Sequence, residues 1–154
     1  MTIKQGTKAP DFKMFDTERK ERSLSEFSGK KTVLAFYPGA YTGVCDKEMC
    51  TFRDSLPELG GLNAQVVGIS VDSPFVNAAF KKEYKLGFPL LSDLDRKVSS
   101  EYVGVYENFG RIPGYSAARR GVVIVDEKGM VTYFWVTENP GEEPDYSAVK
   151  KALA

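Results

Sequence analysis

The sequence predicts an α/β domain in which helices cover a mixed central sheet. Two continuous apolar runs, at residues 32–37 and 65–71, are typical of strands that are buried on both faces. A helical segment separates them, so they are expected to form a parallel pair joined by a right-handed crossover. Residues 121–125 and 130–136 flank a charged turn and predict an antiparallel hairpin. We expect one domain over residues 1–154, because this length suits a single core and no linker or repeat interrupts it.

The residues ahead of the first central strand predict an N-terminal β extension. Residues 2–12 have no regular period and begin in an extended form. Phe12 and Met14 alternate with polar neighbours, and the charged turn 16–20 follows them, which predicts a short surface hairpin. Residues 23–27 then predict one short helical turn before the central sheet begins.

Helices and loops connect the strands in the remainder of the chain. Ser73 and Pro74 are typical of a helix start, since serine is a good N-cap and proline fits the first helical position. The other predicted elements are, in order, a helix from Thr42 that ends near Leu56 and Pro57, a short strand or turn at 89–93, a helix at 97–102, a long loop at 104–118, a loop at 140–144 and a last helix from Asp145. The long loop has no clean period, and loops of that length are often functional.

Both cysteines follow the first central strand. Pro38 ends that strand because proline lacks the N–H that a central strand needs. Thr42 stands at the N-cap position, where its hydroxyl would accept from the N–H of Cys45. Cys45 is then expected in the first turn of a helix, where unpaired N–H groups and the positive end of the dipole lower the pKa of a thiol. The sequence therefore predicts that Cys45 is a nucleophile.

The second cysteine, Cys50, lies five positions after Cys45. In an ideal helix five residues advance ~7.5 Å and turn ~140°, which places the two Cα atoms about 8.6 Å apart. A disulfide tolerates a Cα separation of up to ~7 Å. Either the two cysteines never pair, or pairing requires the helix to unwind, which predicts two conformations of residues 42–54.

The chain is electrically balanced, with 21 basic and 21 acidic side chains. Zero net charge gives no reason to expect nucleic acid or an anionic membrane surface as a partner. No stretch approaches ~18 consecutive apolar residues, so no membrane span is expected. The N-terminal sequence MTIKQGTKAPDF lacks the apolar run of a signal peptide. We therefore expect a cytoplasmic protein.

Histidine is absent from the sequence. This absence excludes Ser-His-Asp and Cys-His catalysis as well as zinc sites with histidine ligands. A zinc site would have to combine carboxylates with two thiolates at an unusual spacing, so we expect neither a metal nor another cofactor. Any activation of Cys45 must come from the helix dipole and from arginine.

The segment around the cysteines resembles a known family. The pattern Pro38-x-x-x-Thr42-x-x-Cys45 is similar to the active-site signature of peroxiredoxins. Cys50, with residues 52–54 (FRD) after it, resembles the subgroup called peroxiredoxin Q or bacterioferritin comigratory protein, an atypical two-cysteine type.

Further matches to this subgroup run along nearly the whole chain. Arg120 stands six residues before Asp126, as the arginine of the subgroup does. Residues 9–12 (APDF), 23–27 (SLSEF) and 70–72 (SVD) also match. The resemblance implies a thioredoxin-like fold with an N-terminal β extension, in agreement with the predicted sheet.

The resemblance also implies roles for the site residues. Cys45 would be the peroxidatic cysteine, whose thiolate attacks a hydroperoxide and becomes a sulfenic acid. The Thr42 hydroxyl and the first-turn N–H groups would bind the peroxide oxygens. Arg120 would stabilise the thiolate and the charge on the leaving oxygen. Pro38 would limit the access of solvent to the sulfenic acid, and Glu48 would orient the arginine.

The same resemblance implies how the oxidised sulfur is recycled. Cys50 would condense with the Cys45 sulfenic acid to an intramolecular disulfide, and a thioredoxin-like dithiol would reduce that bond. The substrates would be hydrogen peroxide and organic hydroperoxides. We expect a monomer, with a weak dimer as the alternative.

Each site residue also has a simpler interpretation. Cys45 could be a small buried apolar residue. Cys50 could belong to the core while an outside thiol resolves Cys45, and Glu48 could be an ordinary carboxylate on the helix surface. Arg119 competes with Arg120, but neighbouring residues of a strand point to opposite faces, so only one of them can reach the thiol.

Two other functions compete with a peroxidase. A dithiol-disulfide oxidoreductase is one, although such proteins usually carry Cys-x-x-Cys and the spacing here is longer. The other is a redox-gated binding or chaperone protein, which would use the same cysteine pair as a switch.

Overall fold

The computed structural model describes residues 2–154 and contains two β-sheets. The larger sheet is built from β1 (Lys13–Phe15), β2 (Glu21–Ser23), β3 (Lys31–Phe36), β4 (Ala64–Ser70), β5 (Leu90–Ser92), β8 (Gly121–Val125) and β9 (Val131–Val136). The smaller sheet pairs β6 (Val105–Tyr106) with β7 (Ala117–Ala118). The helices are α1 (Val44–Gly61), α2 (Pro74–Glu83), α3 (Lys97–Tyr102) and α4 (Tyr146–Leu153), with 3-10 turns η1 (Leu24–Phe27) and η2 (Phe109–Arg111).

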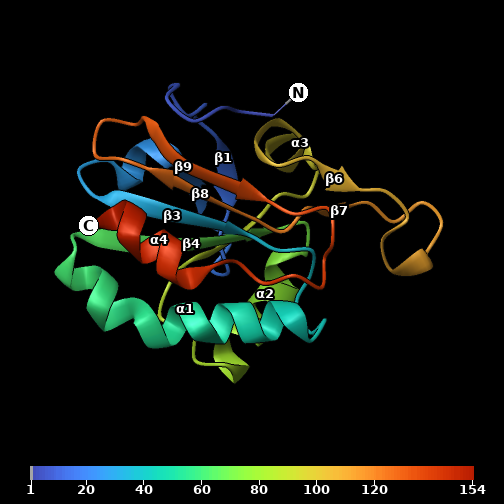
Figure 1. Cartoon of the computed structure of the whole chain (residues 1–154). Coiled ribbons are helices and arrows are strands. Elements are labelled where there is room, and N and C mark those ends of the chain that lie inside the picture. The colour runs from blue at the N-terminus through green and yellow to red at the C-terminus, as the bar shows by residue number, and fades with distance from the viewer. Residues whose placement is uncertain (1) are drawn as a thin grey trace.

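The larger sheet has the strand order β2-β1-β5-β4-β3-β8-β9 (Figure 1). The pairs β3–β4 and β4–β5 are parallel, whereas β3–β8 and β8–β9 are antiparallel. This confirms the predicted mixed sheet, the crossover and the late hairpin. The predicted N-terminal hairpin is also present as β1 and β2, and it extends the sheet because Phe15 pairs with Ser92.

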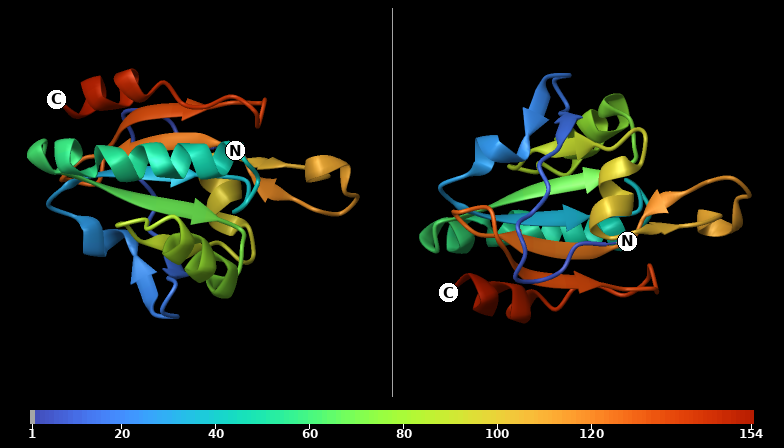
Figure 2. Two further views of the ribbon diagram at one scale, coloured as in Figure 1. Left: turned by 90° about the horizontal axis from the view of Figure 1, so that it is seen from below. Right: turned by 90° about the horizontal axis from the view of Figure 1, so that it is seen from above.

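Helices and turns cover the sheet on both faces, as Figures 1 and 2 show. Side chains along β3 alternate between the two faces: Val33 and Ala35 pack with α1, α2 and α4, whereas Leu34 and Phe36 pack with η1 and α3. All four are fully buried. The unbroken apolar run in the sequence reflects this burial on both faces.

The predicted loop at residues 104–118 contains more regular structure than expected. Its ends pair as β6 and β7, with Val105 opposite Ala118, and the ribbon projects from the body of the protein (Figure 1). Phe109 packs against both Tyr106 and Tyr115 at centroid distances of 6.0 and 5.7 Å. The prediction of an irregular loop was therefore wrong. The pairing joins residues more than ten positions apart, and such contacts produce no periodic pattern in the local sequence.

Helix α1 continues beyond Pro57, where we had expected it to end, and reaches Gly61. A proline inside a helix removes one backbone hydrogen bond, here to the carbonyl of Arg53. The next turn is nevertheless held, because Leu59 is 1% exposed and packs in the core. Tertiary packing therefore overrides the helix-breaking signal.

The other predicted elements lie close to their expected positions. The predicted short strand or turn at 89–93 contains the strand β5 (Leu90–Ser92). The helices α2, α3 and α4 begin at or within one residue of their predicted starts. Within residues 2–154, no helix has both the length and the apolar character needed to cross a membrane.

Candidate active site

Cys45 lies at the carboxyl end of the central strand β3. Pro38 and Gly39 are buried where the chain leaves the sheet, and a short turn then leads into α1. Tyr41 and Gly43 adopt positive φ values of 65° and 81° in this turn. The carboxyl edge of a parallel pair is where open α/β sheets usually bind ligands.

Gly43 is the N-cap of α1, so the prediction that Thr42 caps the helix was wrong. The φ of 81° at Gly43 inserts a turn that moves Thr42 one position away from the helix. The Thr42 hydroxyl donates instead to the carbonyl of Gly39, at 2.8 Å. Thr42 therefore braces the turn in front of Cys45 and is itself exposed.

Arg120 contacts the sulfur of Cys45. Its Nη2 atom lies 3.1 Å from Sγ, although the two residues are 75 positions apart. Arg120 directly precedes β8, and the pairing of Gly121 with Phe36 sets it beside the end of β3. Both side chains are buried: Cys45 is 0% exposed and Arg120 is 1% exposed.

Two further bonds fix the Arg120 guanidinium. Its Nη1 donates to Glu48 Oε1 at 2.7 Å, and its Nε donates to the carbonyl of Pro140 at 3.0 Å. Glu48 lies three residues after Cys45 on α1 and is fully buried. Its second oxygen has no hydrogen-bond partner within residues 2–154. The guanidinium thus contacts both the Cys45 thiol and the buried Glu48 carboxylate. This is the geometry that Glu48 would need in order to orient the arginine, the role predicted for it.

Arg119 points away from this cluster. Its Nε donates to the carbonyl of Val105 at 3.3 Å, and its Nη1 lies 3.5 Å from Glu138. About a third of its side chain is exposed. The two arginines lie between β7 and β8 rather than inside a strand, but their side chains do point apart, and only Arg120 reaches the thiol.

Burial governs the ionisation of this cluster. It raises the pKa of the Cys45 thiol, and the charge of Arg120 opposes the rise without reversing it. The predicted lowering of this pKa was therefore wrong in this closed arrangement, because the sequence did not reveal how completely the sulfur is removed from water. Burial also raises the pKa of Glu48 to about 7, again against the effect of Arg120.

Sequence analysis did not identify Asp72 as a site residue. Its Oδ2 accepts from the N–H of Ala40 at 2.8 Å and from the Ser70 hydroxyl at 2.9 Å. The carboxylate thus holds the turn before Cys45 from the neighbouring strand. The signal was available in the sequence, because Asp72 follows a buried strand that lies parallel to the one before Cys45.

Tyr106 was also missed. Its hydroxyl accepts from the backbone N–H of Arg120 at 3.2 Å and donates to the carbonyl of Thr137 at 2.7 Å. The ribbon β6–β7 therefore supports the arginine from outside the main sheet. No sequence signal could reveal this bond, because the ribbon itself was not predicted.

Cys50 lies in the second turn of α1 and is half-buried. Both thiols are free, and both belong to the same continuous helix. Within residues 2–154, no group of histidine, cysteine, aspartate and glutamate side chains is arranged to hold a metal.

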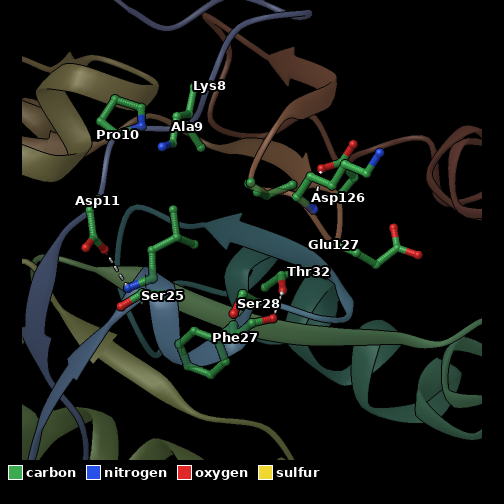
Figure 3. A pocket seen from close by; sticks show the side chains of 14 residues that line it. Lys8, Ala9, Pro10, Asp11, Ser25, Phe27, Ser28, Thr32, Asp126 and Glu127 are labelled. Carbon is green, nitrogen blue, oxygen red and sulfur yellow. Dashed lines mark hydrogen bonds between the residues drawn. The ribbon is translucent and has the colours of Figure 1, made fainter.

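A pocket of about 500 Å³ lies at the opposite end of the sheet. Figure 3 shows it between the N-terminal segment, η1 and the turn that joins β8 to β9. Thr32, at the amino end of β3, lies in its wall, whereas Cys45 follows the carboxyl end. None of the predicted site residues lines this pocket.

Comparison with known proteins gives consistent matches. The model of the AhpC/TSA family matches residues 5–134. The chain is 40% identical over 131 residues to "Peroxiredoxin Q, chloroplastic" of Triticum aestivum, covering 85% of this chain and 58% of that protein. It is also 40% identical over 134 residues to "Putative peroxiredoxin bcp" of Coxiella burnetii, covering 86% of this chain and 87% of that protein.

Solved structures show the same similarity. Peroxidoxin BcpB from Mycobacterium tuberculosis superposes with a TM-score of 0.82 at 30% identity, over 98% of this chain and 94% of that one. A PrxQ variant from Xylella fastidiosa gives a TM-score of 0.85 at 21% identity, over 98% of this chain and 95% of that one, which shows a shared fold. The chain spans less than three fifths of the length of the wheat protein.

Proposed function

Because the chain belongs to the AhpC/TSA family of peroxiredoxins, we propose that it is a thiol peroxidase with Cys45 as the reacting residue. The observation that carries this proposal is the contact of 3.1 Å between Arg120 Nη2 and Cys45 Sγ at the start of α1. A cation at this distance stabilises the thiolate and is also placed to bind an oxygen that gains negative charge. The family match favours a peroxidase over a redox-gated binding protein.

In the first step the Cys45 thiolate attacks the terminal oxygen of a hydroperoxide. The S–O bond forms as the O–O bond breaks, and the other oxygen leaves with the bonding pair and takes a proton to become water or an alcohol. Arg120 binds the developing charge, while Thr42 and the first N–H groups of α1 orient the peroxide. Burial raises the pKa of the Cys45 thiol, and the positive charge of Arg120 opposes that rise, so Arg120 is the group that stabilises the reactive thiolate.

In the second step Cys50 attacks the Cys45 sulfenic acid. The S–S bond forms and the sulfenic hydroxyl leaves as water, with the proton of the Cys50 thiol. Because α1 holds the two cysteines five residues apart, its first turns must unwind before this bond can form. A thioredoxin-like dithiol is the proposed reductant, since it can reopen the disulfide by exchange.

The test is the fate of the two thiols after one equivalent of hydrogen peroxide. We expect intact mass and thiol counting to show that both thiols are lost while the monomer mass is retained. Cys45→Ser should abolish peroxide consumption in stopped flow, whereas Cys50→Ser should allow a single turnover that ends in the sulfenic acid. A Cys45→Ser protein that consumes peroxide at the native rate would refute the assignment.

A further inference from the structure

One face of α1 presents Cys50 between two charged residues. Asp46 lies four residues before it and Arg53 three residues after it, and residues at these spacings share one side of a helix. Cys45 is rotated away from this side by ~140° relative to Cys50 and packs in the core. The two cysteines thus face different surroundings.

Tyr84, which follows α2, binds both charged residues of this face. Its hydroxyl donates to Asp46 Oδ2 at 2.9 Å. Its backbone carbonyl accepts from Arg53 Nη1 at 2.7 Å. The other Asp46 oxygen is buried and has no partner within residues 2–154. Within residues 2–154, the Tyr84 hydroxyl is therefore the hydrogen-bond donor to the Asp46 carboxylate.

The two bonds join Tyr84 to two points on one side of the helical α1. Asp46 and Arg53 are seven residues apart, which in a helix is two turns and ~10.5 Å along the axis. Cys50 lies within this span, and so do the residues that must unwind before its sulfur reaches Cys45. We therefore expect unwinding of this span to break the bond between Asp46 and Tyr84, because it moves Asp46 out of its place on this side of the helix.

Aromatic packing connects the same region to the turn before Cys45. The ring of Tyr41 lies 5.3 Å from Phe80 and 6.3 Å from Tyr84, centroid to centroid. Phe80 and Tyr84 contact each other at 5.3 Å. The bond to Asp46 also raises the pKa of Tyr84 to about 12, so the hydroxyl keeps its proton at physiological pH.

We propose that Tyr84 is a latch that holds the first turns of α1 closed and thereby limits the rate at which Cys50 resolves the Cys45 sulfenic acid. This role rests on the proposed peroxidase function and extends it. Within residues 2–154, the hydrogen bonds of the Tyr84 side chain reach neither the Cys45 thiol nor the Arg120 guanidinium, so Tyr84 is a positioning residue. Its hydroxyl bond to Asp46 is present in the closed helix and absent in the unwound one.

The latch also sets how the sulfenic acid is divided between two fates. In the closed form a second peroxide can oxidise it to a sulfinic acid, transferring one oxygen and releasing water or an alcohol. In the unwound form Cys50 condenses with it instead. A weaker latch should therefore favour the disulfide, and a stronger one the sulfinic acid.

The decisive variant is Tyr84→Phe, which removes the hydroxyl and retains the ring and the backbone carbonyl. Loss of a hydrogen bond to a charged carboxylate should speed the resolution step about tenfold. Rapid quenching followed by intact mass spectrometry would follow the sulfenic acid and the disulfide over time. At high peroxide the fraction of sulfinic acid should fall. An unchanged resolution rate would overturn the latch.

Asp46→Ala and the double variant isolate this bond from other effects. Asp46→Ala also removes a favourable charge from the first turn of the helix, so it should speed resolution on its own. In the Tyr84→Phe background the same change should have a smaller effect, because the shared bond is already lost. Equal effects in both backgrounds would contradict the proposal. Tyr102→Phe is the matched control, since it removes a buried hydroxyl that bonds to Pro10 on the opposite face of the sheet.

Amide hydrogen exchange tests the latch without peroxide. In the reduced protein, Tyr84→Phe should raise exchange about tenfold over residues 46–53 and leave the strands unchanged. Unchanged exchange in this segment would overturn the latch whatever the chemistry of Cys45. If the native protein loses no thiol to peroxide, the proposed function fails instead, and the two failures are thus distinguished.

Discussion

Arg120 and Cys45 meet at 3.1 Å although one precedes a strand and the other begins a helix 75 residues earlier. The guanidinium also bonds to Glu48 at 2.7 Å, so one cation interacts with two acidic groups in a buried site. If only one of Glu48 and Cys45 is ionised, the positive charge of Arg120 stabilises that anion alone. This sharing makes the reactivity of Cys45 dependent on both neighbours.

Arg120→Lys should lower the rate constant with hydrogen peroxide about a hundredfold, a typical effect of removing one donor to a developing oxyanion. Lysine keeps the charge but cannot bond in a fork to Glu48 and Cys45 together. Stopped-flow peroxide consumption measures the change. Arg119→Lys is the matched control and should change the rate less than about threefold, because that side chain is partly exposed and bonds elsewhere. Similar losses in both variants would contradict the role of Arg120.

Glu48→Gln should change how stability depends on pH. The ordinary pKa of 4.5 rises to about 7 in the folded protein through burial. The folded state therefore binds a proton more tightly than the unfolded state, which adds stability below pH 4.5 that is lost as pH rises through 7. The native protein should lose about 3 kcal/mol relative to Glu48→Gln across this window. Urea unfolding at several pH values measures it, and parallel profiles for the two proteins would disprove the assignment.

The Cys45 thiol should titrate above its ordinary pKa, because burial outweighs the charge of Arg120. In a Cys50→Ser background, the ultraviolet absorbance of the thiolate and the rate of alkylation should both rise only at a pH above the ordinary thiol pKa. Glu48→Gln should move the titration downward, since the arginine charge is then no longer shared. A titration well below neutral pH in the Cys50→Ser protein would show that the closed site does not determine the pKa.

Asp72→Ala should loosen the turn in front of Cys45. It leaves the N–H of Ala40 without its bond of 2.8 Å, which should lower the free energy of unfolding by about 1–3 kcal/mol. The rate with peroxide should fall as the turn loses its fixed geometry. Asp72→Asn keeps an acceptor oxygen and should recover most of both losses. Equal behaviour of the two variants would show that the hydrogen bond is not the cause.

Local patterns in the sequence were sufficient for the elements that carry the site. The continuous apolar runs before residues 38 and 72 predicted central strands, and both strands are buried on their two faces. Taking Thr42 as the N-cap placed Cys45 in the first turn of a helix, which is correct although the cap is Gly43, one residue later. The five-residue spacing to Cys50 was enough to exclude a disulfide within an intact helix. Each of these inferences depends on residues close together in the chain.

Tertiary structure alone decided the contacts and the environment of the sulfur. The distance from Arg120 to Cys45, the continuation of α1 past Pro57 and the two bonds of Tyr84 join segments that no local period relates. The direction in which the pKa of Cys45 moves was also undetermined, because it depends on how much water the packed chain removes from the thiol. A sequence specifies which groups are available, whereas desolvation and Coulomb energies depend on where packing places them.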